Sequence, residues 1–133
     1  MTRRQARELA FILLFEQSFS NEAMTDVIKT AEEARDAKIG DFTRELAEGA
    51  ILKSDEIDKI IYAHCEKWKE GRISRVAMSV MRLAVYEMIY VEDLDEGVSI
   101  NEAVELAKKY GGDEDPSFIN GILGGISRRD KVE

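Results

Sequence analysis

Apolar residues recur at three- and four-residue steps along most of this 133-residue chain. Such spacing gathers apolar side chains on one face of an α-helix, whereas a half-buried strand would alternate apolar and polar residues, and no stretch here does so. The sequence therefore predicts an all-α fold. Because short connections join the predicted helices, we expect a single domain over residues 1–133, long enough to bury roughly two thirds of its unfolded surface.

Capping residues and glycines divide the chain into about seven predicted helices. Thr2 and Gln5 have the spacing of a capping box, which begins a first helix that runs to about Ser18. Ser99 and Glu102 repeat that spacing further along the chain. The other predicted helix starts are Asn21, Asp41, Ser54, Ser74 and Asp115, and the predicted stops are Gly40, Gly71 and Gly111.

Two predicted helices carry the strongest apolar patterns. The helix that begins at Ser54 has one apolar face, formed by Ile57, Ile60, Ile61, His64 and Trp68. His64 is the only histidine, and its place in this stripe favours a core or boundary position over catalysis. The segment from Ser74 to Tyr90 has a wider apolar arc, which is typical of a central helix packed by several neighbours.

The composition excludes several classes of protein. No apolar run approaches the roughly 18 residues of a membrane span, and no small-residue cleavage site follows Phe11–Phe15, so we expect neither a membrane protein nor a secretory signal. The single cysteine, Cys65, excludes an internal disulfide and agrees with the reducing cytoplasm. A net charge of −8 argues against polyanion binding over the whole surface, although it permits a local basic site.

No pattern of residues predicts catalysis. His64 and Cys65 point about 100° apart around their helix, so they do not converge on one metal, and no Cys or His cluster has zinc spacing. None of the glycine pairs is followed by the lysine and hydroxyl residue of a phosphate-binding loop. We therefore expect no enzyme, no metal and no cofactor.

An arginine cluster opens the first predicted helix. Arg3 and Arg4 lie in the first turn, where the helix dipole disfavours cations by about 0.3–1 kcal/mol each, and Arg7 lies one turn along. Phe11 and Phe15 continue the same line at four-residue steps. Guanidinium groups that lead into aromatic rings suit a single-stranded nucleic acid, because guanidinium binds phosphate and rings stack on unpaired bases. The alternative is that the arginines only solubilise the helix and the phenylalanines are core; for Phe11 the core is favoured.

Sequence blocks that span nearly the whole chain resemble the NusB family. They are RRQARE at Arg3–Glu8, MRLAVYEM at Met81–Met88, VSINEAVELAKKYG at Val98–Gly111 and FINGIL at Phe118–Leu123. The resemblance implies two roughly orthogonal helical bundles in one compact domain. It also implies a bacterial transcription antitermination factor that binds single-stranded boxA RNA together with NusE, a small-subunit ribosomal protein. The pair would help to assemble the antitermination complex on RNA polymerase, notably during ribosomal RNA synthesis.

The resemblance also assigns residues to two contact surfaces. RNA contacts map to Arg3, Arg4, Arg7, Phe15, Lys108, Lys109, Glu114, Ser117 and Phe118. The NusE-like partner maps to the start of the long helix, at Ala77, Met78 and Met81. Relatives often carry charged residues at the first two partner positions and a more basic residue at Ser117. Asn120 fits a bond across a helix interface or an RNA contact equally well.

Other shared residues have structural explanations, and other functions remain open. Asn101 is expected to stabilise a helix start, Glu102 to complete a capping box, and Arg82 to pair with Glu87. NusB-like domains also precede RNA cytosine methyltransferase domains, so an enzyme accessory is one alternative. A helical adaptor that binds protein and never RNA is another. The sequence is compatible with a monomer or a homodimer.

Overall fold

The computed structural model of the protein describes residues 1–65, 73–92 and 94–132, with side chains as far as Arg128. Within these residues the chain forms seven helices and no strand, which confirms the predicted all-α fold. The helices are α1 (Arg3–Ser20), α2 (Met24–Arg35), α3 (Asp41–Leu52), α4 (Ser54–Ala63), α5 (Arg75–Tyr90), α6 (Glu96–Tyr110) and α7 (Asp115–Val132).

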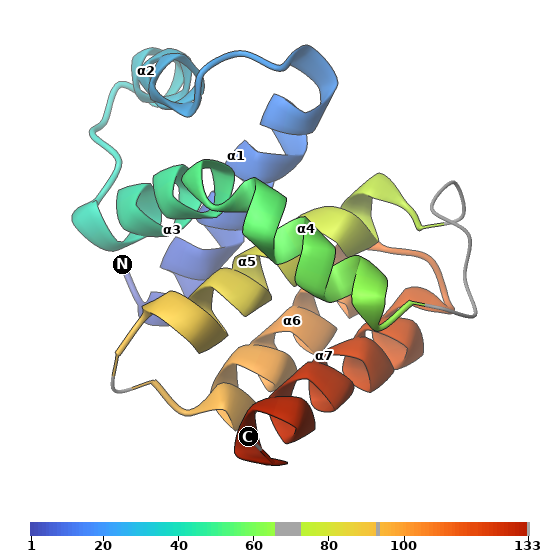
Figure 1. The fold of residues 1–133 in the computed structure, drawn as a ribbon. Helices are drawn as coiled ribbons and strands as arrows, with labels where there is room; N and C mark the ends of the chain where they lie inside the picture. The colour runs from blue at the N-terminus through green and yellow to red at the C-terminus, as the bar shows by residue number, and fades with distance from the viewer. Residues whose placement is uncertain (66–72, 93, 133) are drawn as a thin grey trace.

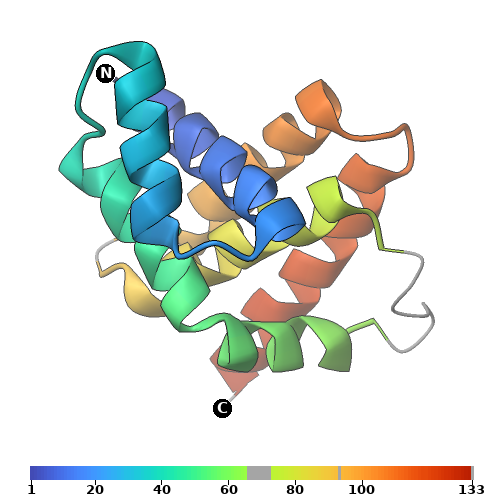
Figure 2. The same ribbon diagram turned by 90° about the horizontal axis from the view of Figure 1, so that it is seen from above.

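The helices pack in two sets that share α5 as their common element (Figure 1). Helices α1, α2 and α3 pack on one another, and the view from above shows α2 lying beside α1 (Figure 2). Helices α4, α6 and α7 form the second set, in which α6 and α7 run side by side. Helix α5 contacts α1 and α3 on one side and α4, α6 and α7 on the other.

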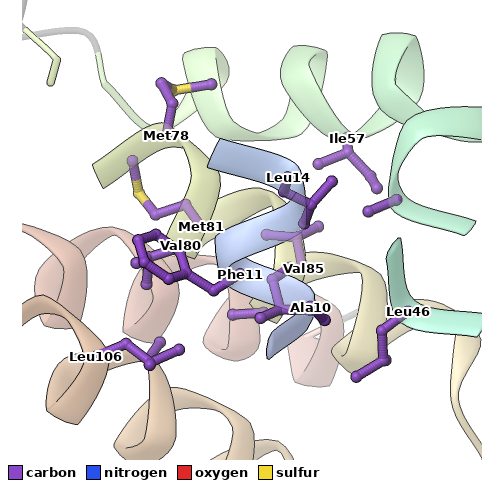
Figure 3. Close-up of a cluster of buried hydrophobic side chains, with 14 of the residues drawn as sticks. Ala10, Phe11, Leu14, Leu46, Ile57, Met78, Val80, Met81, Val85 and Leu106 are labelled. Atoms are coloured by element: carbon purple, nitrogen blue, oxygen red, sulfur yellow. The ribbon is translucent and has the colours of Figure 1, made fainter. Parts of the chain in front are cut away.

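The central position of α5 agrees with its predicted wide apolar arc. Nine of its residues are buried, and the apolar ones among them meet side chains from α1, α3, α4 and α6 in the core (Figure 3). Phe11 is 1% exposed and packs in this core, so the core interpretation of that residue is confirmed. The burial that holds the two helix sets together is therefore concentrated around one helix.

The capping box predicted at the start of α1 is present. Thr2 Oγ1 accepts a hydrogen bond from the Gln5 backbone N–H at 3.1 Å, and Gln5 Oε1 accepts one from the Thr2 N–H at 2.9 Å. The first turn of α1 contains no acidic residue, so these two bonds are its stabilising feature. They fix the helix start from which Arg3 and Arg4 project.

Removal of this cap should destabilise the protein modestly. We expect Thr2→Ala to lower the free energy of unfolding by about 1 kcal/mol, because an amide of the first turn loses its acceptor. Thr2→Ser keeps the hydroxyl and should remain close to the wild type. Urea denaturation followed by circular dichroism measures both variants, and equal losses in the two would contradict a capping role.

Asn21 ends α1 and does not begin α2, contrary to the prediction. Its backbone is left-handed, with φ of 58°, and its N–H donates to the Gln17 carbonyl at 3.0 Å. Asparagine tolerates the left-handed backbone conformation that ends many helices. Its side chain can also cap the start of a helix, so an asparagine is compatible with either end. Helix α1 therefore continues two residues beyond Ser18, and α2 begins at Met24.

Three other predicted boundaries also need correction. Helix α2 ends at Arg35 and does not reach Gly40, because the next residue, Asp36, takes a left-handed conformation. Asp41 is the first residue of α3 and does not cap it. Helix α6 begins at Glu96 because the Asp95 side chain accepts from the Gly97 N–H at 2.7 Å. Ser99 consequently lies inside α6, and the second capping box does not form.

Other boundaries agree with the sequence more closely. Ser74 caps α5 by accepting from the Ala77 N–H at 3.0 Å, and α6 ends at Tyr110, before Gly111. Helix α4 begins at Ser54 and ends at Ala63, so His64 is its half-buried C-cap. The predicted positions of Trp68 and Gly71 lie outside the described residues.

A close contact between α3 and α5 depends on Gly49. A Cβ atom at this position would lie 2.2 Å from Cζ of Tyr86, which is far inside van der Waals contact. We expect Gly49→Ala to lower the free energy of unfolding by about 1–3 kcal/mol, because the tyrosine ring must move.

Gly121, in α7, has no atom within 4 Å of such a Cβ. Gly121→Ala should therefore stabilise by about 0.5–1 kcal/mol. Thermal unfolding compares the two, and similar effects would contradict the packing argument.

Candidate nucleic-acid interface

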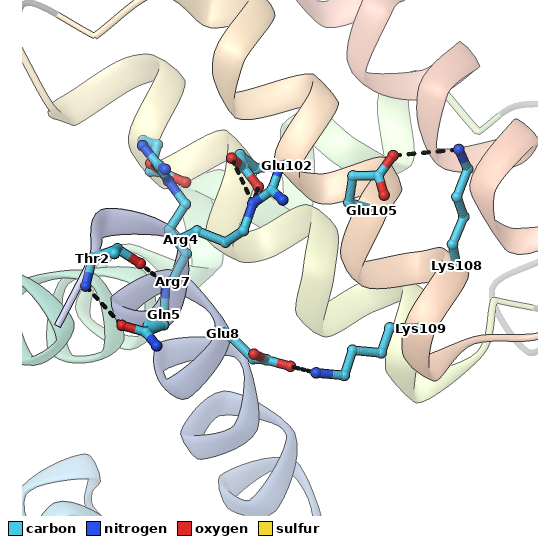
Figure 4. Close-up of polar contacts among 10 residues, drawn as sticks. Thr2, Arg4, Gln5, Arg7, Glu8, Glu102, Glu105, Lys108 and Lys109 are labelled. Atoms are coloured by element: carbon cyan, nitrogen blue, oxygen red, sulfur yellow. Dashed lines mark hydrogen bonds and ion pairs between the residues drawn. The ribbon is translucent and has the colours of Figure 1, made fainter.

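A groove of about 370 Å³ runs between the first half of α1 and the second half of α6. Its lining is dominated by charged side chains of both signs, at Arg4, Arg7, Glu8, Glu102, Glu105, Leu106, Lys108 and Lys109. The fold thus brings the arginine-rich start of the chain beside Lys108 and Lys109, about a hundred residues later (Figure 4). Four of the residues predicted to bind RNA meet in this groove.

Three of these cations are well exposed and are held by carboxylates. Arg4 Nε lies 3.1 Å from Glu102 Oε2, and Lys108 Nζ lies 3.3 Å from Glu105 Oε1. Lys109 pairs with Glu8, across the groove. The side chains of Arg4, Lys108 and Lys109 are 65%, 60% and 62% exposed. Their partners Glu102 and Glu8 are only 16% and 25% exposed, whereas Glu105 is 46% exposed. Because the cation of each pair lies largely in solvent, the pairs contribute little stability and the cations can exchange partners at small cost.

Arg7 differs from the exposed phosphate ligand that its place in the arginine cluster suggests. Its side chain is 5% exposed, and its Nε lies 2.6 Å from Oε1 of Glu87, which is also buried. The burial follows from helix geometry, because Arg7 lies one turn before Phe11 on the face of α1 that meets α5. Glu87 is a charged residue within the apolar arc of α5. A buried carboxylate needs a partner, so its position in the sequence was a signal for a buried pair.

The charge of Glu87 depends on that arginine. Burial raises the pKa of Glu87 above its ordinary value, and the hydrogen bond and charge of Arg7 act in the opposite direction. The predicted pair of Glu87 with Arg82 is wrong. Arg82 instead makes a two-pronged bond to Asp58, with distances of 2.8 and 2.9 Å.

Arg3, the remaining member of the cluster, stacks on an aromatic ring. Its guanidinium carbon lies 3.8 Å from the ring centroid of Phe42 in α3, and the residue is exposed. This cation–π contact leaves guanidinium N–H groups available to a ligand. Arg3 therefore lies at the surface near the groove's arginine end but does not belong to its lining.

A row of four aromatic rings extends along α1 from the end of α6. The centroid of Tyr110 lies 5.0 Å from that of Phe11, Phe11 lies 6.0 Å from Phe15, and Phe15 lies 5.0 Å from Phe19. Phe15 is half-buried, whereas Tyr110 and Phe19 are 37% and 62% exposed. Sequence reasoning missed both exposed rings, although Phe19 continues the four-residue step of Phe11 and Phe15.

The far end of this row joins α1 to the start of α5. The Arg75 guanidinium carbon lies 4.5 Å from the Phe19 ring centroid, and Arg75 Nη1 donates to the Ser18 carbonyl at 2.7 Å. The start of α7 is tied to the same end of α5, because Ser74 Oγ donates to Asp115 Oδ2 at 3.2 Å.

The predicted RNA residues of α7 lie outside the groove. Glu114 and Ser117 are exposed, and Phe118 is half-buried against the core. Asn120 is also exposed. Glu114 lies in the loop between α6 and α7, and Ser117 and Phe118 lie in the first turn of α7, so none of them is among the paired cations that line the groove.

The three residues predicted to contact a protein partner are buried in this chain. Ala77 and Met81 are 0% exposed and Met78 is 6% exposed, all in the core around α5. The structure therefore does not present the side chains of Ala77 and Met81 as a surface, whereas Met78 lines a groove beside Arg75. The nearby exposed positions on the same helix turn are Ser74 and Arg75.

These features define a helical domain whose conspicuous surface is a groove of paired charges beside an aromatic row. Among the described residues, no group of three His, Cys, Asp or Glu side chains is placed to hold a metal ion. In the same part of the chain, no helix has the length and apolar content needed to cross a membrane.

Comparison with known proteins gives the particular family. Residues 4–128 match the NusB family. The transcription antitermination protein NusB of Carboxydothermus hydrogenoformans is 46% identical, covering 96% of this chain and 93% of that protein. The structure of T. maritima NusB superposes with a TM-score of 0.86 at 34% identity, covering 96% of this chain and 92% of that one. This chain belongs to the NusB family.

A second similar structure contains NusE and RNA. A crystal structure of the antitermination factors NusB and NusE in complex with double-stranded RNA matches with a TM-score of 0.83 at 28% identity. The match covers 97% of this chain and 99% of that one.

Proposed function

We propose that this protein is a transcription antitermination factor that binds boxA RNA together with the ribosomal protein NusE. The bound pair helps to assemble the antitermination complex on RNA polymerase, notably for ribosomal RNA synthesis. Family membership supports this role, as does the likeness to a structure of NusB and NusE with RNA. The protein acts in the bacterial cytoplasm as one domain and performs no catalysis of its own.

The observation that carries the proposal is the meeting of exposed cations from α1 and α6 in one groove. Arg4, Lys108 and Lys109 bind phosphates of the RNA, and their flexible, exposed side chains can leave their present partners to do so. Arg3 adds a guanidinium group at the same end. Arg7 acts through its buried pair with Glu87, which fixes the part of α1 that carries Arg4.

Unpaired bases stack on the aromatic row. Tyr110 and Phe19 are the exposed rings of the row, and half-buried Phe15 lies between Phe11 and Phe19. Rings bind single-stranded RNA because unpaired bases expose their faces, whereas a duplex hides them. The RNA then continues toward the start of α7, where Glu114, Ser117 and Phe118 lie.

The partner NusE docks at the start of α5. Because Ala77, Met78 and Met81 are buried, they shape this docking surface from below, and the exposed Arg75 beside Phe19 meets the partner. The docking surface and the aromatic row are therefore neighbours. This proximity gives a physical route by which NusE strengthens RNA binding through thermodynamic coupling.

Fluorescence anisotropy with labelled RNA tests the proposal. We expect modest affinity of the protein alone for single-stranded boxA, tighter binding when NusE is added, and weaker binding of a scrambled strand and of a boxA duplex. Equal affinity for boxA and the scrambled RNA in the presence of NusE would overturn the proposal. Binding of NusE without any binding of RNA would instead support a protein-only helical adaptor.

A further inference from the structure

We infer that Glu8, Glu102 and Glu105 act as competing anions within the RNA groove and set its affinity for phosphate. This inference rests on the proposed function and adds a determinant of how tightly the same site binds RNA. Each of the three exposed cations in the groove is paired with one of these carboxylates (Figure 4). A phosphate group must displace a carboxylate before it reaches Arg4, Lys108 or Lys109.

The geometry favours competition over a purely structural role. The pairs lie at the mouth of a groove, and the cations are each at least 60% exposed. Exposed ion pairs of this kind add little to folding stability. The Lys108–Glu105 pair lies within α6, three residues apart, so it joins no two helices. Its carboxylate nevertheless holds a groove cation in the same way as the other two.

Glu8 shows how firmly one of these anions is held in place. It accepts hydrogen bonds from Lys109 and from the Tyr110 hydroxyl. These bonds lower the pKa of Glu8, so the carboxylate remains ionised at neutral pH. Tyr110 in turn packs on Phe11 at the head of the aromatic row. When Lys109 turns to a phosphate, Glu8 loses its cation but still orients the tyrosine.

The consequence is a threshold of affinity for phosphate. Non-specific binding of nucleic acid depends almost entirely on phosphate contacts, whereas specific binding adds contacts to bases. Carboxylates that weaken the phosphate contacts of Arg4, Lys108 and Lys109 leave little affinity for an arbitrary strand. An RNA that also stacks on the aromatic row, or that is bound by NusE, overcomes the deficit. The deficit is the same for both strands, so it leaves the ratio of their affinities unchanged and acts by keeping arbitrary strands from occupying the groove.

The test replaces the three carboxylates by amides of the same shape. Glu8→Gln, Glu102→Gln and Glu105→Gln change the net charge from −8 to −8 + 3 = −5. Glutamine oxygens can still accept the hydrogen bonds of Tyr110 and Arg4. The matched control is Glu22→Gln, Glu33→Gln and Glu45→Gln, three exposed positions outside the groove with the same change in charge. The single variant Glu105→Gln removes the pair that joins no helices.

Fluorescence anisotropy at one salt concentration measures boxA and a scrambled strand, without NusE, for each variant. We expect the groove triple variant to bind both RNAs about tenfold more tightly than the wild type, and Glu105→Gln about twofold more tightly, as exposed pairs allow. The control triple should change affinity by less than about twofold. Equal gains in the groove and control triples, or no gain in the groove triple or in Glu105→Gln, would overturn the inference.

Failure of this inference is distinct from failure of the proposed function. If wild-type protein with NusE prefers boxA but the groove triple gains nothing over the control, only the competing role of the carboxylates is lost. If neither the wild type nor the groove triple prefers boxA to the scrambled strand with NusE present, the proposed function itself is lost.

Discussion

Arg7→Met should unfold far more easily than the wild type, with a loss of about 3–5 kcal/mol in the free energy of unfolding. The reason is that Glu87, 1% exposed, would keep its burial and lose the guanidinium 2.6 Å away. A buried charge without a partner is costly, even where the intact pair contributes little net stability. Urea denaturation at neutral pH measures the loss.

Two companion variants separate the lost charge partner from lost packing. Arg7→Met combined with Glu87→Leu removes both charges and should recover most of the stability, because an apolar pair fills the same space. Arg4→Met changes an exposed arginine of the same helix and should cost less than about 1 kcal/mol. If the double variant were as unstable as Arg7→Met, an uncompensated Glu87 would not be the cause.

The same variant should show a characteristic pH dependence. Burial already raises the pKa of Glu87 in the folded wild type, and loss of Arg7 raises it further, because Arg7 acts in the opposite direction. A raised folded-state pKa means that the folded protein holds the proton more tightly than the unfolded chain does. Stability is therefore lost as the pH rises from about 4.3, the ordinary glutamate value, through the folded-state pKa. The deficit of Arg7→Met should shrink as the pH is lowered toward that range.

Removal of the groove cations should produce the largest effect on RNA binding. In the triple variant Arg4→Ala, Lys108→Ala and Lys109→Ala, three phosphate contacts are lost and three carboxylates are left to repel the RNA. We expect affinity for boxA with NusE to fall roughly tenfold to a hundredfold near physiological salt. The slope of log affinity against log salt should flatten by about 2, at about 0.7 per lost contact with a single strand.

A control of equal charge makes this experiment specific. Lys29, Lys38 and Lys59 are exposed positions outside the groove, and their replacement by alanine changes the net charge by the same amount. This variant should retain nearly all of the wild-type affinity and slope. An equal loss in both triple variants would show that total charge, and not the groove, governs binding.

Arg7 illustrates why part of the candidate site was not predictable. The cluster of Arg3, Arg4 and Arg7 suggests three equivalent cations, yet the structure exposes two and buries the third. Helical spacing places Arg7 on the same face as Phe11, but only the position of α5 shows that Glu87 faces it. The predicted contact of Arg7 with RNA stays a prediction, and we propose that Arg7 acts by positioning α1 through its pair with Glu87.

The helix boundaries also separate what neighbouring residues predict from what the rest of the fold decides. Thr2 and Gln5 predicted the start of α1 correctly, because the capping box needs only neighbouring residues. The predictions at Asn21 and Ser99 were wrong for different reasons. Asparagine can also end a helix, as Asn21 does in α1, and Asp95 caps α6 before Ser99 is reached. Capping potential is local, but the choice between two adjacent caps depends on what the rest of the chain buries.

The sequence by itself determined the all-α class, the central position of α5, the burial of Phe11 and the family to which the chain belongs. These properties depend on periodicity, local caps and residue identity, which are written along the chain. Only the tertiary structure decided that Arg4 meets Glu102, that Lys109 meets Glu8 and that Ala77 and Met81 are buried. Contacts between residues about a hundred positions apart depend on how the helices pack. The helical period of a segment shows which of its faces is apolar, but not which other helix packs against that face.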